Sequence, residues 1–73
     1  MSEIEEMKNS MVSVLALMLM EKDKNLSLEQ ALSLVINSDT YQKLLDDRTR
    51  LYFQSPNYVF SFLENELKTG RVG

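Results

Sequence analysis

The carboxylates are the side chains of this protein best suited to acid–base chemistry. The chain has 11 aspartates and glutamates but neither histidine nor cysteine, so the common catalytic triads and soft-metal sites cannot form within one copy. Two close carboxylate pairs occur, Asp46 with Asp47 and Glu64 with Glu66. Because side chains one or two residues apart on a helix do not face each other, we interpret both pairs as solvated surface. The sequence therefore predicts no catalytic residue and a protein that is not an enzyme, unless a site forms across subunits or with another protein.

The segment "EKDKN", residues 21–25, imitates the start of a calcium-binding loop. The rest of the pattern fails, since Leu26 occupies the place of the required glycine and Leu32 that of the bidentate glutamate. The two glycines, Gly70 and Gly73, cannot build a glycine-rich phosphate loop. We predict no metal and no cofactor.

A DNA-binding regulator of the helix-turn-helix kind is the alternative function. Two predicted helices flank the stretch "NSDT", and three cations on the second could contact phosphate: Lys43, Arg48 and Arg50. Three carboxylates on the same segment would repel phosphate: Asp39, Asp46 and Asp47. The turn also lacks glycine, and the net charge of −3 supplies no overall field that attracts nucleic acid. Nucleic acid is therefore the less favoured partner.

Helices must position whatever surface the protein uses, and three of them carry clear start signals. Ser2 with Glu5 forms a capping box for the first helix, and Ser27 with Gln30 forms another for a helix over residues 28–37. "NSDT" offers caps for a third helix that reaches Tyr52. The apolar spacing within the first helix follows a heptad seam, with a second stripe beside it: Ile4, Met7, Met11, Val14 and Met18, then Val12, Leu15 and Leu19.

Residues 50–70 permit two interpretations. As a hairpin, "RLYF" and "YVFSF" would pair across "QSPN". As a helix, Ser55 is the cap, Pro56 takes the first turn and Gly70 ends it. The apolar face of that helix would consist of Val59, Phe62, Leu63 and Leu67. We predict the helix, and with it an all-α fold, a small bundle of three to four short helices forming one domain over residues 1–73 with a flexible tail at 69–73.

The stretch "LYFQSPNY", Leu51–Tyr58, reads leucine, tyrosine, any residue, glutamine, serine, two residues, tyrosine. It resembles a motif in a family of short uncharacterised bacterial all-helical proteins, a domain of unknown function, in which histidine often stands at the position of Tyr52. The likeness extends over residues 7–68, with "LSLEQAL" as the second helix. The resemblance implies a compact helical domain without known enzymatic activity, and a partner protein encoded nearby.

The apolar run "MVSVLALMLM", residues 11–20, needs a reason of its own. At about 15 Å as a helix, it is too short to span a bilayer, and we predict no membrane association. Four methionines in and before the run could line an adaptable groove, but we interpret them as filling the core, except for Met20: Met7, Met11, Met18 and Met20.

With the seam and Leu15 facing the core, the opposite side of the first helix carries Ser13, Leu17 and Met20. A chain of 73 residues without disulfides gains from self-association, so we predict a homodimer through these three residues. The hydroxyls of Tyr52 and Tyr58 are expected at the surface, as a second partner surface. The lack of cysteine agrees with a cytoplasmic, non-enzymatic protein–protein interaction module.

Overall fold

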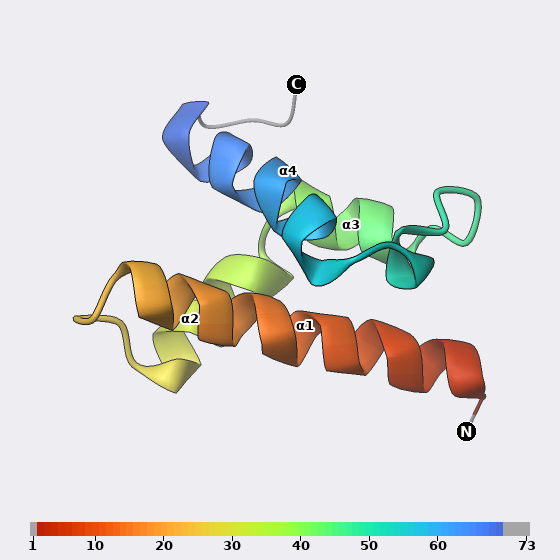
Figure 1. Ribbon diagram of the computed structural model, residues 1–73, viewed down its shortest axis with the longest axis horizontal. Helices are drawn as coiled ribbons and strands as arrows, with labels where there is room; N and C mark the ends of the chain where they lie inside the picture. Colours follow the sequence, from red (N-terminus) through yellow and green to blue (C-terminus); the bar gives the residue numbers. More distant parts are fainter. Residues whose placement is uncertain (1, 70–73) are drawn as a thin grey trace.

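The computed structural model describes residues 2–69 and confirms the all-α fold class (Figure 1). In chain order the elements are α1 (Glu3–Lys22), α2 (Leu28–Ile36), α3 (Asp39–Leu45), the 3-10 helix η1 (Leu51–Phe53) and α4 (Pro56–Thr69). No helix within residues 2–69 is both long and apolar enough to cross a membrane.

Serine side chains begin the α-helices, as the sequence predicts. The Ser2 hydroxyl accepts a hydrogen bond from the Glu5 N–H at 3.2 Å. Ser27 and Gln30 form a complete capping box, in which each side chain accepts from the backbone of the other at 3.1 and 2.9 Å. The Ser38 hydroxyl accepts from the Tyr41 N–H at 3.0 Å. Each bond satisfies a backbone donor that has no partner within its own helix.

The predicted extension of α3 to Tyr52 is wrong, because the helix ends at Leu45. The carboxylate of Asp46 accepts from the Arg48 N–H at 2.9 Å, which closes a tight turn. The Thr49 hydroxyl donates to the Lys43 carbonyl at 2.6 Å and so occupies one of the free acceptors at the helix end. Arg50 then adopts the left-handed conformation, with φ 53°, and a right-handed helix cannot continue through that residue.

The helical interpretation of the last segment is confirmed from Pro56 onward. Ser55 accepts from the Tyr58 N–H at 3.2 Å, and Pro56 is the first helical residue. The predicted apolar face is right at Val59 and Leu63, which are fully buried, whereas Phe62 is half-buried and Leu67 is exposed. Phe60 occupies the core in their place. Residues 70–73, including most of the predicted tail and its Gly70 stop, lie outside the described residues, and Thr69 ends α4.

Helix α1 lies between α2 on one side and α3, η1 and α4 on the other (Figure 1). At about 30 Å it extends along most of the molecule's longest dimension of 34 Å. Ala16 of α1 and Ala31 of α2 are both fully buried, and small residues let two helices approach closely. Leu15 and Leu44 are also inaccessible to solvent and lie in the same core.

The predicted core face of α1 needs a correction at two positions. Ile4 and Val14 are exposed, and Ala16 and Leu19 are buried. Because α2 packs against α1, the buried side of α1 includes Ala16. The side that carries Val14 is left uncovered. A single-stripe interpretation misses this because α1 is covered from two directions.

Candidate interaction surface

The predicted interface on α1 is exposed at two of its three positions. Ser13 is exposed and Leu17 is 57% exposed, the second most exposed large apolar side chain among residues 2–69. Met20 is half-buried and packs against the core. Met20 follows the buried Ala16 by one helical turn, so it shares the covered side of α1. The expectation that Met20 lacks cover is therefore wrong.

The uncovered face of α1 contains a short uncharged stretch. Ser10, Ser13, Val14 and Leu17 are all exposed, and they are spaced three and four residues apart. This spacing places them on one side of the helix. We call these four residues the α1 patch. Its centre contains the small side chain of Ser13, which would let a second helix approach closely.

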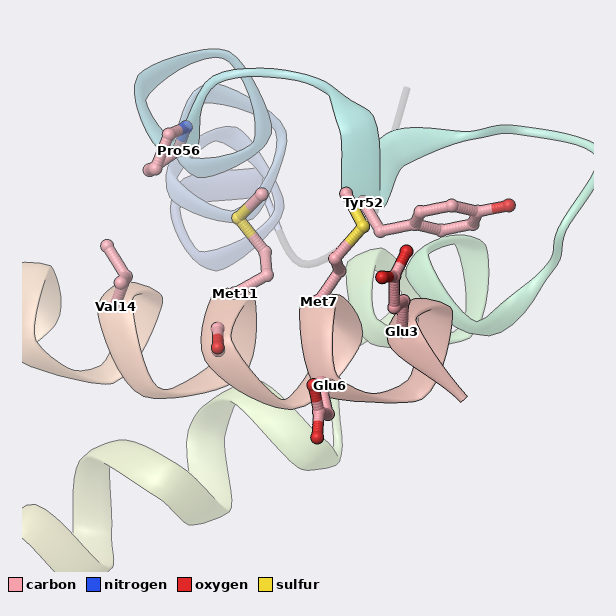
Figure 2. Close-up of a pocket in the computed structure, with 8 residues that line it drawn as sticks. Glu3, Glu6, Met7, Met11, Val14, Tyr52 and Pro56 are labelled. Atoms are coloured by element: carbon pink, nitrogen blue, oxygen red, sulfur yellow. The ribbon is translucent and has the colours of Figure 1, made fainter. Parts of the chain in front are cut away.

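A cleft of about 540 Å³ lies between α1 and the segment that links η1 to α4, and it shares Ser10 and Val14 with the α1 patch. Figure 2 shows Met7, Met11 and Val14 pointing from α1 toward Tyr52 and Pro56, which form the opposite wall. The remaining lining residues are Glu3, Glu6 and Ser10, all exposed. We call this cleft the α1–η1 groove. The interpretation of Met7 and Met11 as core residues therefore holds in part, because both pack with the core and both also line the groove.

The two tyrosines of the predicted second surface are in different environments. Tyr52 is 6% exposed and lines the groove, whereas Tyr58 is 50% exposed and is not among the lining residues. The ring of Tyr58 makes an edge-to-face contact with Phe62 at 5.1 Å between centroids. Figure 2 shows the Tyr52 hydroxyl pointing away from the groove. The ring of Tyr52 is thus buried, whereas Tyr58 is open to a partner.

Lys8 holds the wall of the groove in place. Its Nζ donates to Asp47 Oδ1 at 2.7 Å and to the Leu45 carbonyl at 3.0 Å. The same ammonium lies 5.4 Å from the centroid of the Tyr52 ring, within the range of a cation–π contact. The hydrogen bond to Asp47 raises the pKa of Lys8 above its usual value, which keeps the ammonium charged. Sequence reasoning missed this contact because it joins residues 39 positions apart.

Glu66 holds the first turn of α3. Its carboxylate accepts from the Asp39 N–H at 2.7 Å, the Thr40 N–H at 2.9 Å and the Thr40 hydroxyl at 2.8 Å. Burial would raise the pKa of Glu66, but these hydrogen bonds outweigh burial and lower it. The interpretation of Glu66 as solvated surface is therefore wrong. In a helix-turn-helix arrangement α3 would be the recognition helix, and this carboxylate lies at the end that would approach the nucleic acid.

The other carboxylates singled out in the sequence have cationic neighbours. Asp46 pairs with Arg48 through hydrogen bonds of 2.8–3.2 Å, and these bonds lower the pKa of Asp46 to about 2. Glu64 lies 3.4 Å from Lys22. Within residues 2–69 no group of three or more acidic side chains is arranged to hold a metal ion. The carboxylates thus form separate structural pairs.

Comparison with known proteins finds no match: no family model, no curated protein sequence and no solved structure is similar to this chain at a significant level.

Proposed function

We propose that this protein is a non-enzymatic protein–protein interaction module that self-associates as a homodimer through the α1 patch. The observation that carries the proposal is the exposure of Leu17 on an uncharged stretch of α1, beside the small side chains of Ser10 and Ser13. A two-fold pairing would place the same patch on both partners. The Leu17 side chain of each protomer would then be buried against the patch of its partner.

The size of the chain favours this use of the patch. A domain of 73 residues buries a modest fraction of its surface when it folds alone. Burying a large aliphatic side chain contributes about 1.5–3 kcal/mol before the costs of association. Glu6 and Glu21 lie on the same side of α1 beyond the patch. Like charges would approach each other if two α1 helices ran side by side along their whole length, so the helices are expected to cross near Ser13.

Sedimentation velocity of wild type and Leu17→Glu tests the proposal. We expect the wild-type chain to sediment with twice the chain mass and the variant with the single-chain mass. Leu28→Glu is the matched control, because Leu28 is 49% exposed on α2 and lies outside the patch. A variant that sediments like wild type, with both folded by circular dichroism, would contradict the proposal. Met20 is left unchanged because it packs against the core.

DNA binding is the weaker candidate. A short connection, residues 37–38, joins α2 to α3, although the turn of a helix-turn-helix usually has about three or four residues. However, α3 has seven residues, Glu66 holds its first turn, and Arg48 is paired with Asp46. We expect no salt-dependent mobility shift with duplex DNA, and such a shift would favour the regulator instead.

The remaining parts of the proposal rest on the sequence. Placement in the cytoplasm is proposed because the absence of cysteine agrees with a reducing compartment. A partner encoded nearby follows from the resemblance of Leu51–Tyr58 to the family motif. Affinity capture of the tagged chain from its source cell, followed by mass spectrometry, tests the nearby partner.

A further inference from the structure

The α1–η1 groove combines an apolar floor with carboxylates at one end. Met7 and Met11 form the floor, while Glu3 and Glu6 lie toward the start of α1 (Figure 2). Unbranched methionine side chains adapt to the shape of whatever packs on them. The groove therefore suits an apolar side chain that is flanked by positive charge.

No cation is among the lining residues of the groove. Lys8, the lysine nearest in sequence, is held on Asp47 and the Leu45 carbonyl. Glu5, the third carboxylate of this turn, lies outside the groove and lines a separate hollow together with Lys8. The carboxylates at this end of the groove are thus without a neutralising partner in the groove itself.

We propose that the α1–η1 groove binds a basic amphipathic helix of another protein. Apolar residues one turn apart on that helix would pack on Met7, Met11 and Val14, and its Lys or Arg side chains would pair with Glu3 and Glu6. The lining residues extend from Glu3 to Val14, which is about 16 Å along α1. A partner helix of about three turns matches that length.

A second copy of the chain is a poorer occupant of the groove than a basic partner. The chain carries a net charge of −3. Three of its own cations are engaged in ion pairs: Lys8 with Asp47, Lys22 with Glu64 and Arg48 with Asp46. The inference deepens the proposed function, since it depends on the protein being an interaction module. The groove shares Ser10 and Val14 with the α1 patch but excludes Ser13 and Leu17, so self-association and binding of the basic helix are expected to compete.

Methyl NMR with a synthetic peptide tests the inference. The probe is an 18-residue helical peptide with leucine on one face and lysine on the other, and the matched peptide carries glutamate in place of lysine. With ¹³C-labelled methionine methyl groups, we expect the lysine peptide to shift the Met7 and Met11 signals and to leave Met20 unchanged, because Met20 lies outside the groove. Equal shifts with the glutamate peptide, or shifts confined to Met20, would overturn the proposal.

Charge variants test the role of the carboxylates. We expect Glu3→Gln combined with Glu6→Gln to weaken the lysine peptide about 2- to 30-fold, as two exposed charge pairs would. The control combines Glu21→Gln with Glu29→Gln, which removes the same charge outside the groove. Equal weakening by both pairs would show nonspecific attraction and contradict the proposal.

The Leu17→Glu variant separates the two surfaces. We expect it to bind the lysine peptide at least as tightly as wild type, since Leu17 is outside the groove and the monomer leaves the shared residues Ser10 and Val14 free. If wild type is monomeric and still binds the peptide through Met7 and Met11, self-association fails and the groove proposal stands. If wild type is dimeric and the peptide leaves these methyl signals unmoved in the Leu17→Glu monomer as well, the groove proposal fails and self-association stands.

Discussion

At the scale of single residues, the contacts that organise this protein are of two kinds. Local ones, such as Ser27 with Gln30, can be predicted from the sequence because a helix brings residues three apart together. Distant ones, such as Lys8 with Asp47 and Glu66 with Thr40, cannot, because no short-range pattern relates residues 26 or 39 positions apart. The groove depends on the distant kind, since Lys8 holds the loop that leads into its Tyr52 wall.

Glu66 should make stability dependent on pH. Its folded-state pKa is lowered, so the stability it contributes is present above the unfolded pKa and is lost as pH falls through the folded pKa. We expect Glu66→Gln to lower the free energy of unfolding by about 1–2 kcal/mol at neutral pH, because three donors lose a charged acceptor. Urea unfolding at a series of pH values checks this. The difference in unfolding free energy between wild type and Glu66→Gln should shrink under acidic conditions. A difference that stays constant with pH, or that the control Glu29→Gln reproduces, would argue against a stabilising role for the Glu66 hydrogen bonds.

Arg50 should tolerate glycine better than any branched residue. Its φ of 53° lies in the left-handed region, which glycine adopts freely and which costs β-branched residues the most. We expect Arg50→Val to be less stable than Arg50→Gly by about 1 kcal/mol or more. Thermal unfolding of both variants measures this. The control pair is Lys43→Gly and Lys43→Val in helix α3, where the order should reverse and the glycine variant should be the less stable. Equal stability of the valine and glycine variants at position 50 would contradict the left-handed conformation of Arg50.

At the scale of elements, start signals are more informative than lengths. The serine caps and Pro56 are local features, so the starts of α2, α3 and α4 can be predicted. The end of α3 depends on Thr49 reaching back to Lys43 and on the backbone of Arg50. Neither feature has a periodic signature in the sequence. Which apolar residues of α4 are buried depends in turn on where α1 and α3 lie.

Phe60 and Leu67 test the observed face of α4. Phe60 is buried and Leu67 is exposed, although the sequence pattern favours Leu67. We expect Phe60→Ala to cost about 3–5 kcal/mol, which would unfold much of a domain this small, and Leu67→Ala to cost less than about 1 kcal/mol. Circular dichroism and thermal unfolding measure both. Similar losses for the two variants would show that α4 faces the core with a different side.

At the scale of the whole molecule, α1 is the element that both builds the core and leaves a free surface. Its buried side contacts α2, α3, η1 and α4, while the α1 patch and the groove share its uncovered side. The width of the apolar run in the sequence predicts that α1 contributes to the core. The sequence also correctly places Ser13 and Leu17 outside the core. It misplaces Met20, Ile4 and Val14, because which sides of α1 are covered depends on where the other helices pack.

The central claim is that α1 presents a self-associating surface, and the most direct test is the mass of the wild-type chain in solution over a range of concentrations. Sedimentation equilibrium should show twice the chain mass at high concentration and a shift toward the single-chain mass on dilution, since a patch of four residues supports a modest, reversible dimer. Leu17→Glu should remain at the single-chain mass throughout. A wild-type chain that keeps the single-chain mass at millimolar concentration would contradict the claim.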